Sequence, residues 1–348
     1  MPGFDAIIGQ DRPIRILNAF LQKGTFPHAL LFTGLEGVGK KGAAVAFAMA
    51  CNCTGRPLPV DNQRDESRPA DQTGPEVRSS TDLPCGACKQ CRKIEAASHP
   101  DVIQLQPAGP FIKIDQIRTL CQTLAMKPYE ARVRVVIISN AQTMNPAAGN
   151  ALLKMLEEPP ASTVLILLAS HASDLLPTIV SRCQQVRFYP VSRKNLASVL
   201  IDRHGMSSGD AQVIATMAGG SISRALQMHQ SNWINRRNWL IDESEAISRG
   251  SVNRLLAFGE QLSRDKENLP EALEVMKCWL RDLVVTRLSA KHIINQDLTD
   301  RLQQASQKTT LSSLLSKLEA IQTTQNAIKA GTNLRLAMES LVLKLSRV

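Results

Sequence analysis

The sequence predicts an α/β core followed by helical domains, and two observations support this fold class. Between residues 1 and 190, short apolar segments of strand length alternate with helical segments, the pattern of a parallel sheet covered by helices. After Tyr189-Pro190 the strand pattern stops and helical periodicity continues to the end of the sequence. We therefore expect a parallel-sheet domain, then domains made only of helices.

Five apolar segments are the candidate strands of the core: Ala29–Thr33, Val102–Gln106, Arg134–Ser139, Val164–Ala169 and Gln185–Phe188. The helices expected between or before them are Asp11–Lys23, Lys40–Cys51, Ile114–Ala125 and Pro146–Glu157. The last helix carries the clearest boundary signals. Asn145 is its expected N-cap, Pro146 takes the first helical position, and Pro159-Pro160 stops it.

Three domains follow from this pattern: a core over residues 1–190, a small helical lid over 191–232, and a helical bundle over 233–348. In the bundle, Leu311, Leu314, Leu315, Leu318 and Ile321 fall on one face at helical spacing. Within the core, residues 54–84 are rich in Pro, Asp, Arg and Ser and poor in large apolar side chains. Such a segment cannot offset its ordering entropy, so we expect a disordered insertion there.

Net charge, the absence of long apolar runs and the number of cysteines indicate the kind of partner and compartment. The formal charge of +10 suggests a polyanionic partner such as nucleic acid, although a basic surface without a specific partner is an equal alternative. The first residues lack the features of a secretory signal, and no apolar run reaches the length of a bilayer span. We expect a cytoplasmic protein whose eight cysteines serve a metal or the core rather than disulfides.

A phosphate-loop frame follows the first strand. Gly34, Gly37, Gly39 and Lys40 stand in a strand, G-x-x-x-x-G-K, helix context, in which backbone N–H groups and the lysine face phosphates. The next position normally holds Ser or Thr as a Mg²⁺ ligand, but here it is Lys41. The motif therefore keeps its phosphate-binding residues but lacks the hydroxyl that binds Mg²⁺.

The strand Arg134–Ser139 should end in two carboxylates, one to hold the Mg²⁺ shell and one to align water. It ends instead in Ser139-Asn140, a hydroxyl and an amide. Together with Lys41, this removes both protein groups that would manage the metal. We predict that the chain does not hydrolyse ATP, while weak ATP binding at Gly34–Lys40 stays open.

Several further motifs give the chain a family resemblance, which spans almost its whole length. Gly149–Pro160 (GNALLKMLEEPP), Leu176–Cys183 (LPTIVSRC) and Gly9-Gln10 resemble the clamp-loader branch of the AAA+ ATPases. Because the strand Arg134–Ser139 also lacks the two carboxylates at its end, the chain is similar to the delta-prime type of bacterial DNA polymerase III subunit rather than to the catalytic gamma/tau type. The resemblance implies a RecA-like AAA+ core, a lid and a helical collar for oligomerisation.

The resemblance also implies a role in trans for Arg182. In Ser181-Arg182-Cys183, Arg182 matches the arginine finger, which reaches the γ-phosphate in a neighbouring subunit. The alternative is an ordinary surface arginine. By register, Ser223 stands where active members carry their sensor arginine, so a third ATPase element is missing.

The cysteine spacing predicts a metal site. Cys85, Cys88 and Cys91 offer three thiolates in one turn, and a fourth ligand upstream would complete a tetrahedral Zn²⁺ site. Cys51 and Cys53 are the two candidates, and the family's Asn-Cys pair favours Cys53. A closed four-cysteine site has no open coordination position, so we expect a structural zinc module over residues 53–91, with a redox switch or free thiols as alternatives.

These observations favour a clamp-loader subunit without independent catalysis. The partners implied by the resemblance are gamma/tau and delta subunits, the sliding clamp, and primed DNA within the complex, with no membrane. One rival is a gamma/tau-like ATPase, and Lys41, Ser139, Asn140 and Ser223 argue against it. The other is a stand-alone, zinc-containing DNA-binding protein, for which the net charge of +10 is the argument.

Overall fold

The computed structural model describes residues 3–55, 84–247, 251–288 and 292–346. The chain divides into two compact units. The first comprises Met1–Asn195 and Gly220–Ser223, and the second comprises Leu196–Gly219 and Arg224–Val348. The predicted insertion at 54–84 lies almost entirely outside the described residues. None of the helices in the described part of the chain is both long and apolar enough to cross a bilayer.

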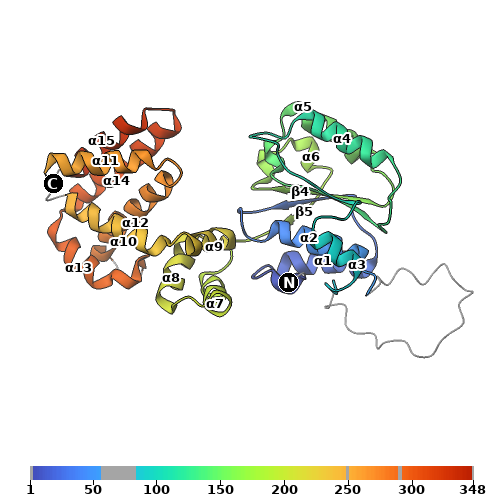
Figure 1. The fold of residues 1–348 in the computed structure, drawn as a ribbon, viewed down its shortest axis with the longest axis horizontal. Coiled ribbons are helices and arrows are strands. Elements are labelled where there is room, and N and C mark those ends of the chain that lie inside the picture. Colours follow the sequence, from blue (N-terminus) through green and yellow to red (C-terminus); the bar gives the residue numbers. More distant parts are fainter. Residues whose placement is uncertain (1–2, 56–83, 248–250, 289–291, 347–348) are drawn as a thin grey trace, which may run out of the picture. The chain divides into compact units, whose positions relative to one another are not determined.

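The first unit contains a β-sheet with helices on its faces (Figure 1). The sheet has five strands in the order β2-β3-β4-β1-β5, and every pair of neighbours is parallel. The strands are β1 (Ala29–Thr33), β2 (Val102–Leu105), β3 (Arg134–Ile138), β4 (Thr163–Ala169) and β5 (Gln184–Arg187). All residues of the three central strands are buried. This agrees with the predicted α/β core, because a parallel sheet is covered on both faces.

Helices cover the two faces of the sheet as two separate layers (Figure 1). One layer consists of α1 (Asp11–Lys23), α2 (Lys40–Asn52) and α3 (Lys89–Glu95). The other consists of α4 (Ile114–Ala125), α5 (Pro146–Glu157) and α6 (Pro177–Val180).

The boundary signals read from the sequence act as expected in α5. The side chain of Asn145 accepts a hydrogen bond from the N–H of Ala148, and the helix ends before Pro159. At the other end of the first unit, the Gln10 amide exchanges two hydrogen bonds with the backbone of Tyr189. The Gly9-Gln10 motif therefore ties the start of the core to the point where its last strand ends.

The second unit is helical. Its first helices along the chain are α7 (Arg193–His204), α8 (Ser208–Met217) and α9 (Ile222–Gln230), of which α7 and α9 begin in the first unit. The others are α10 (Trp233–Ile247), α11 (Val252–Arg264), α12 (Leu269–Leu288), α13 (Thr299–Lys308), α14 (Leu311–Lys329) and α15 (Leu334–Ser346). The α/β plus α fold class is thus confirmed, while the predicted borders at 190 and 232 stay predictions.

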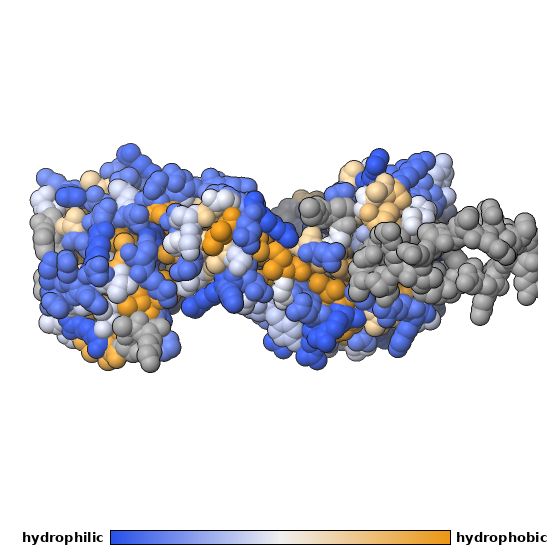
Figure 2. Space-filling model, turned by 90° about the horizontal axis from the view of Figure 1, so that it is seen from below, coloured by the Kyte–Doolittle hydropathy of each residue, from blue (hydrophilic) through white to orange (hydrophobic). Residues whose placement is uncertain are grey.

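The surface is mainly hydrophilic on the face drawn in Figure 2, with hydrophobic residues in smaller patches between hydrophilic ones. In α14, Leu314 and Ile321 of the predicted apolar face are buried, whereas Leu311 and Leu315 are exposed. The buried side of α14 instead includes Lys317 and Thr324. The helix is therefore rotated relative to its leucine stripe, and a charged residue lies inside the bundle.

Candidate functional site

The phosphate-loop frame lies where β1 runs into α2. Gly39 has a left-handed backbone, with φ of +103°, and Lys40 begins the helix. The ammonium of Lys40 donates to the carbonyl oxygens of Gly34 and Leu35, the latter at 2.8 Å. Burial lowers the pKa of Lys40, and the nearby Glu36 carboxylate opposes this effect. The ammonium of Lys40 is therefore hydrogen-bonded to the backbone of the loop, at the place where it would contact a bound phosphate.

A cavity of about 380 Å³ opens beside this loop. It is lined by the three residues that stand where an ATPase has its Mg²⁺-binding and water-aligning side chains, namely Lys41, Ser139 and Asn140. Ser223, the residue in the sensor position, lines it as well. The structure therefore gathers the substitutions noted in the sequence around one space, where a hydrolase would need a carboxylate and a hydroxyl to hold Mg²⁺.

The glycines of the frame are required by packing, whatever binds there. A Cβ atom at Gly34 would lie 2.4 Å from the carbonyl oxygen of Phe188. At Gly37, whose φ is +78°, a Cβ would lie 2.2 Å from the Ser221 hydroxyl. The Gly37 carbonyl also accepts hydrogen bonds from the N–H groups that open α9, at 2.9 Å from Ile222 and 3.3 Å from Ser223. These contacts hold the loop against neighbouring backbone.

Arg182 lies in the turn between α6 and β5, with 37% of its side chain exposed. Its guanidinium donates to the Thr178 carbonyl at 3.0 Å and pairs with the Glu157 carboxylate at 2.9 Å. Glu157 is the last residue of α5, and the adjacent Glu158 is exposed. The guanidinium therefore remains accessible while one carboxylate holds it against its own subunit.

Four cysteines form a cluster beside α2 and α3. The sulfur atoms of Cys53, Cys85, Cys88 and Cys91 all lie within 4.8 Å of one another, and this cluster could hold a metal ion. In a tetrahedral thiolate site with bonds of about 2.3 Å, neighbouring sulfurs are about 3.8 Å apart. The Sγ atoms of Cys85 and Cys91, 4.0 Å apart, come close to that spacing. Cys51, the other upstream candidate, is buried outside the cluster.

The surroundings of the cluster suit a cation bound by thiolates. Burial opposes ionisation of Cys88, but the Thr54 side chain and the N–H groups of Cys91, Thr54 and Gly55 lower its pKa to about 6. The Cys53 thiol, burial and the Cys88 thiol raise the pKa of Cys91. Crowded thiols of this kind lose their protons together when a cation neutralises them. A Cβ atom at Gly55 would lie 2.9 Å from Cys85 Sγ, so a larger residue there would have to displace this sulfur.

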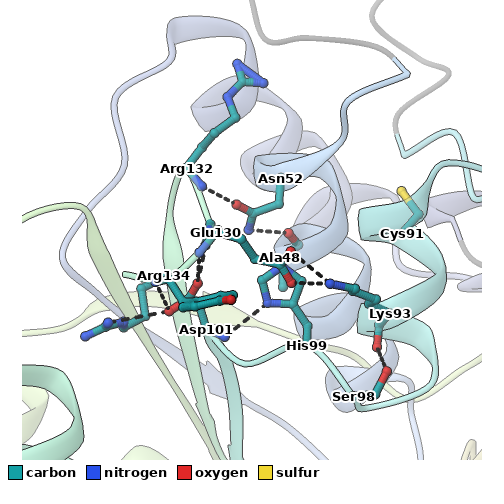
Figure 3. Close-up of polar contacts among 12 residues, drawn as sticks. Ala48, Asn52, Cys91, Lys93, Ser98, His99, Asp101, Glu130, Arg132 and Arg134 are labelled. Carbon is teal, nitrogen blue, oxygen red and sulfur yellow. Dashed lines mark hydrogen bonds and ion pairs between the residues drawn. The ribbon is translucent and has the colours of Figure 1, made fainter. Parts of the chain in front are cut away.

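A buried polar network connects the cluster's helices to the chain that enters β3 (Figure 3). The Asp101 carboxylate accepts from the N–H groups of Tyr129, Glu130 and Ala131 at 2.8–2.9 Å, and pairs with Arg134 at 3.5 Å. Burial raises the pKa of Asp101, but these N–H groups and Arg134 outweigh it, and the pKa falls below its ordinary value.

Two further contacts extend this network towards α2 and α3. The Asn52 amide oxygen accepts from the N–H groups of Arg132 and Val133, and Lys93 binds Glu130. His99 precedes β2 and is buried, and its Nδ1 accepts from the Asp101 N–H at 3.1 Å. The sequence marks Asn52 through the Asn-Cys pair, but not its contacts, because these join residues far apart in the chain.

Comparison with known proteins agrees with this architecture. A family model described as DNA polymerase III, delta subunit matches residues 9–192, more than half of the chain. A second, described as the C-terminal part of that subunit, matches residues 230–347.

Individual relatives show the same likeness. The chain is 27% identical to the delta-prime subunit of DNA polymerase III from Bacillus subtilis, over 97% of this chain and 96% of that protein. It is 30% identical to the tau subunit from the same organism, over 78% of this chain but 45% of that protein. A solved gamma-subunit-related protein from Thermotoga maritima covers 97% of this chain and 99% of its own at 17% identity, with a TM-score of 0.41. The chain therefore belongs to the DNA polymerase III delta-subunit family, and a delta-prime subunit is among the relatives that it matches over nearly their whole length.

Proposed function

We propose that this chain is a delta-prime-type subunit of a bacterial clamp loader, which helps to place the sliding clamp on primed DNA. Its partners in this role are gamma/tau and delta subunits. The observation that carries the proposal is the contrast between two sites of the first unit. The phosphate-loop cavity has Lys41, Ser139 and Asn140 where a hydrolase manages its metal, whereas Arg182 is accessible at the surface.

In this role Arg182 works on a neighbour's nucleotide. A guanidinium delivered across a subunit interface stabilises the charge that spreads over the transferring phosphoryl group, which couples hydrolysis to assembly. The pairing of Arg182 with Glu157 and Thr178 is compatible with this, because a phosphate carrying more charge than one carboxylate can displace it.

The test is a reconstituted loader containing gamma/tau, delta and this chain, with Arg182→Ala compared with the wild type. We expect the single-turnover rate of ATP hydrolysis at the neighbouring site to fall by about 10³-fold, the contribution typical of an arginine finger. Arg187→Ala is the matched control, because Arg187 is also exposed and lies in β5 nearby. Unchanged turnover with Arg182→Ala, in a complex that still assembles, would contradict the role in trans.

For the cysteine cluster we propose a structural Zn²⁺ site held by Cys53, Cys85, Cys88 and Cys91. Four thiolates complete the coordination of zinc, so the ion would stabilise the fold and would carry out no chemistry on a substrate. The lowered pKa of Cys88 and the close sulfur spacing support this choice of ligands. Elemental analysis of the purified chain should find one zinc per chain, lost in the Cys88→Ser variant.

A gamma/tau-like ATPase is the second candidate, because the glycine frame and Lys40 are retained. It requires that the purified chain hydrolyse ATP with Mg²⁺ in the absence of partners. We expect no turnover above that of a Lys40→Ala variant. Tight, salt-sensitive binding of DNA by the isolated chain would instead favour a stand-alone DNA-binding protein.

A further inference from the structure

A second cavity lies within the helical unit, far along the chain from the phosphate loop. Its volume is about 700 Å³, and its walls come from α10, α11, α12, α13, α14 and α15. Small-molecule sites commonly have volumes of about 300–1,000 Å³, more than one inserted side chain fills. The cavity is therefore large enough for a small organic ligand.

One wall of this cavity is apolar and belongs to the core of the bundle. The side chains that form it are each at most 5% exposed: Met276, Trp279, Leu283, Leu314 and Leu345. Such a wall gains free energy by covering apolar surface of a ligand. It would accept an acyl chain or an aromatic ring.

A lysine of α14 lines the same cavity. Lys317 is 7% exposed over the whole residue, and it also lines a surface hollow beside Ser316 and Glu319. Its stem is therefore buried while its ammonium still reaches the surface, the usual arrangement of a lysine. Burial lowers its pKa, and among the described residues it has no ion-pair or hydrogen-bond partner. An ammonium that is partly removed from water and has no counter-ion would gain from pairing with a ligand anion.

The acidic residues of the cavity are already paired with other cations. Arg301 binds both Asp242, at 2.7 Å, and Glu245, at 2.9 Å, and its guanidinium stacks over the Trp279 ring at 5.6 Å. Arg254, which also lines the cavity, pairs with Glu243 at 3.1 Å. These carboxylates therefore already have cationic partners, whereas Lys317 is a partly buried cation without a partner among the described residues.

We infer that this cavity binds a small amphipathic anion, whose acidic group meets Lys317 and whose apolar body lies on the Trp279 wall. The two halves of the site are complementary to the two halves of such a molecule. This inference does not depend on the clamp-loader role, because every residue that carries it lies in the helical unit.

The test uses the full chain and two probes of known chemistry. Anilinonaphthalene sulfonate, which combines a sulfonate with aromatic rings, should bind saturably, one per chain, with a rise in fluorescence. Decanoate should displace it, whereas decanol, which has the same chain length without the charge, should displace it at least tenfold less well. Equal displacement by decanol, or no saturable binding, would overturn the inference.

Substitutions then locate the site. Lys317→Met should weaken decanoate binding at least tenfold while leaving the thermal transition intact or raised, because it removes a partly desolvated charge without a partner and keeps the apolar stem. Lys329→Met is the matched control, with the same charge change on the same helix, and should bind like the wild type. Ala305→Phe, at the cavity wall, should block both probes. If the wild type takes up neither probe but Lys317→Met weakens assembly with gamma/tau and delta, the cavity receives an acidic side chain of a neighbour, and the inference is wrong.

Discussion

The phosphate loop and the cysteine cluster lie at the two ends of α2 and differ in what they contain. The loop has the backbone of its motif without the side chains that manage a metal, whereas the cluster has side chains that could hold one. The loop retains its backbone frame, since Gly34 and Gly37 pack against neighbouring chain, but has lost the side chains that manage a metal. The cluster brings together four cysteines that could hold a metal ion, although residues 54–84 separate the first from the rest. A motif's frame and its chemistry can therefore persist separately, so each has to be tested by itself.

The largest effect is expected at the cluster. Cys85→Ser combined with Cys88→Ser should destabilise the first unit by about 5 kcal/mol or more, because apparent zinc-binding energies at structural sites are about 10–16 kcal/mol. Thermal unfolding of the holoprotein measures this, and a strong chelator should produce the same loss in the wild type. Cys121→Ser, in α4 outside the cluster, is the control. Equal transition temperatures for the wild type, the double variant and Cys121→Ser would mean that no metal stabilises the cluster.

A smaller effect is expected from the network beside the cluster. Asp101→Asn should cost about 3 kcal/mol, because it leaves Arg134 buried without its carboxylate. The folded-state pKa of Asp101 lies below its ordinary value of 3.8. Its contribution is therefore complete above about pH 4 and is lost as the pH falls through the folded-state value. Urea unfolding at pH 7 and at pH 3 should show a smaller difference between the two proteins at pH 3.

How much of this could be foreseen depends on the range of the interactions. The five strands, the capped helix α5 and the ligand spacing in Cys85–Cys91 are local patterns, and the structure contains each of them. The short helix α3 was not foreseen, since it has only two turns and lies among the cysteines.

The remaining features depend on contacts between distant residues, which a single sequence does not reveal. The Asp101 network joins segments about thirty residues apart. The rotation of α14 that buries Lys317 is set by its packing against α12 and α15, because a leucine stripe does not fix which of its edges faces a neighbour.

At the phosphate loop, the glycine frame should be essential to stability even without nucleotide. Gly37→Ala should cost about 2 kcal/mol, because the substitution forces a Cβ into a left-handed backbone and against Ser221. Gly42→Ala is the control. It lies in α2 with open space around its Cα, so added helix propensity should leave stability equal or higher. Equal behaviour of the two variants would mean that the loop is held for another reason.

The smallest effect concerns the ion pair that restrains Arg182. In the reconstituted loader, Glu157→Gln should raise ATP turnover without clamp or DNA by about two- to fivefold, the range that a surface ion pair supports. The increase should disappear when Arg182→Ala is added. Glu158→Gln changes the same charge one residue away and should leave turnover unaltered. An equal effect of both glutamine variants would indicate a general change of surface charge.

The turn at Gly55 has a practical consequence. The chain leaves the core there and returns at Pro84, directly before Cys85, with Gly55 against the Cys85 side chain. The chain therefore leaves and re-enters the described structure at one spot beside the cysteine cluster. A fluorophore or an affinity handle inserted between Gly55 and Pro84 should leave the thermal transition of the sheet and its helices unchanged.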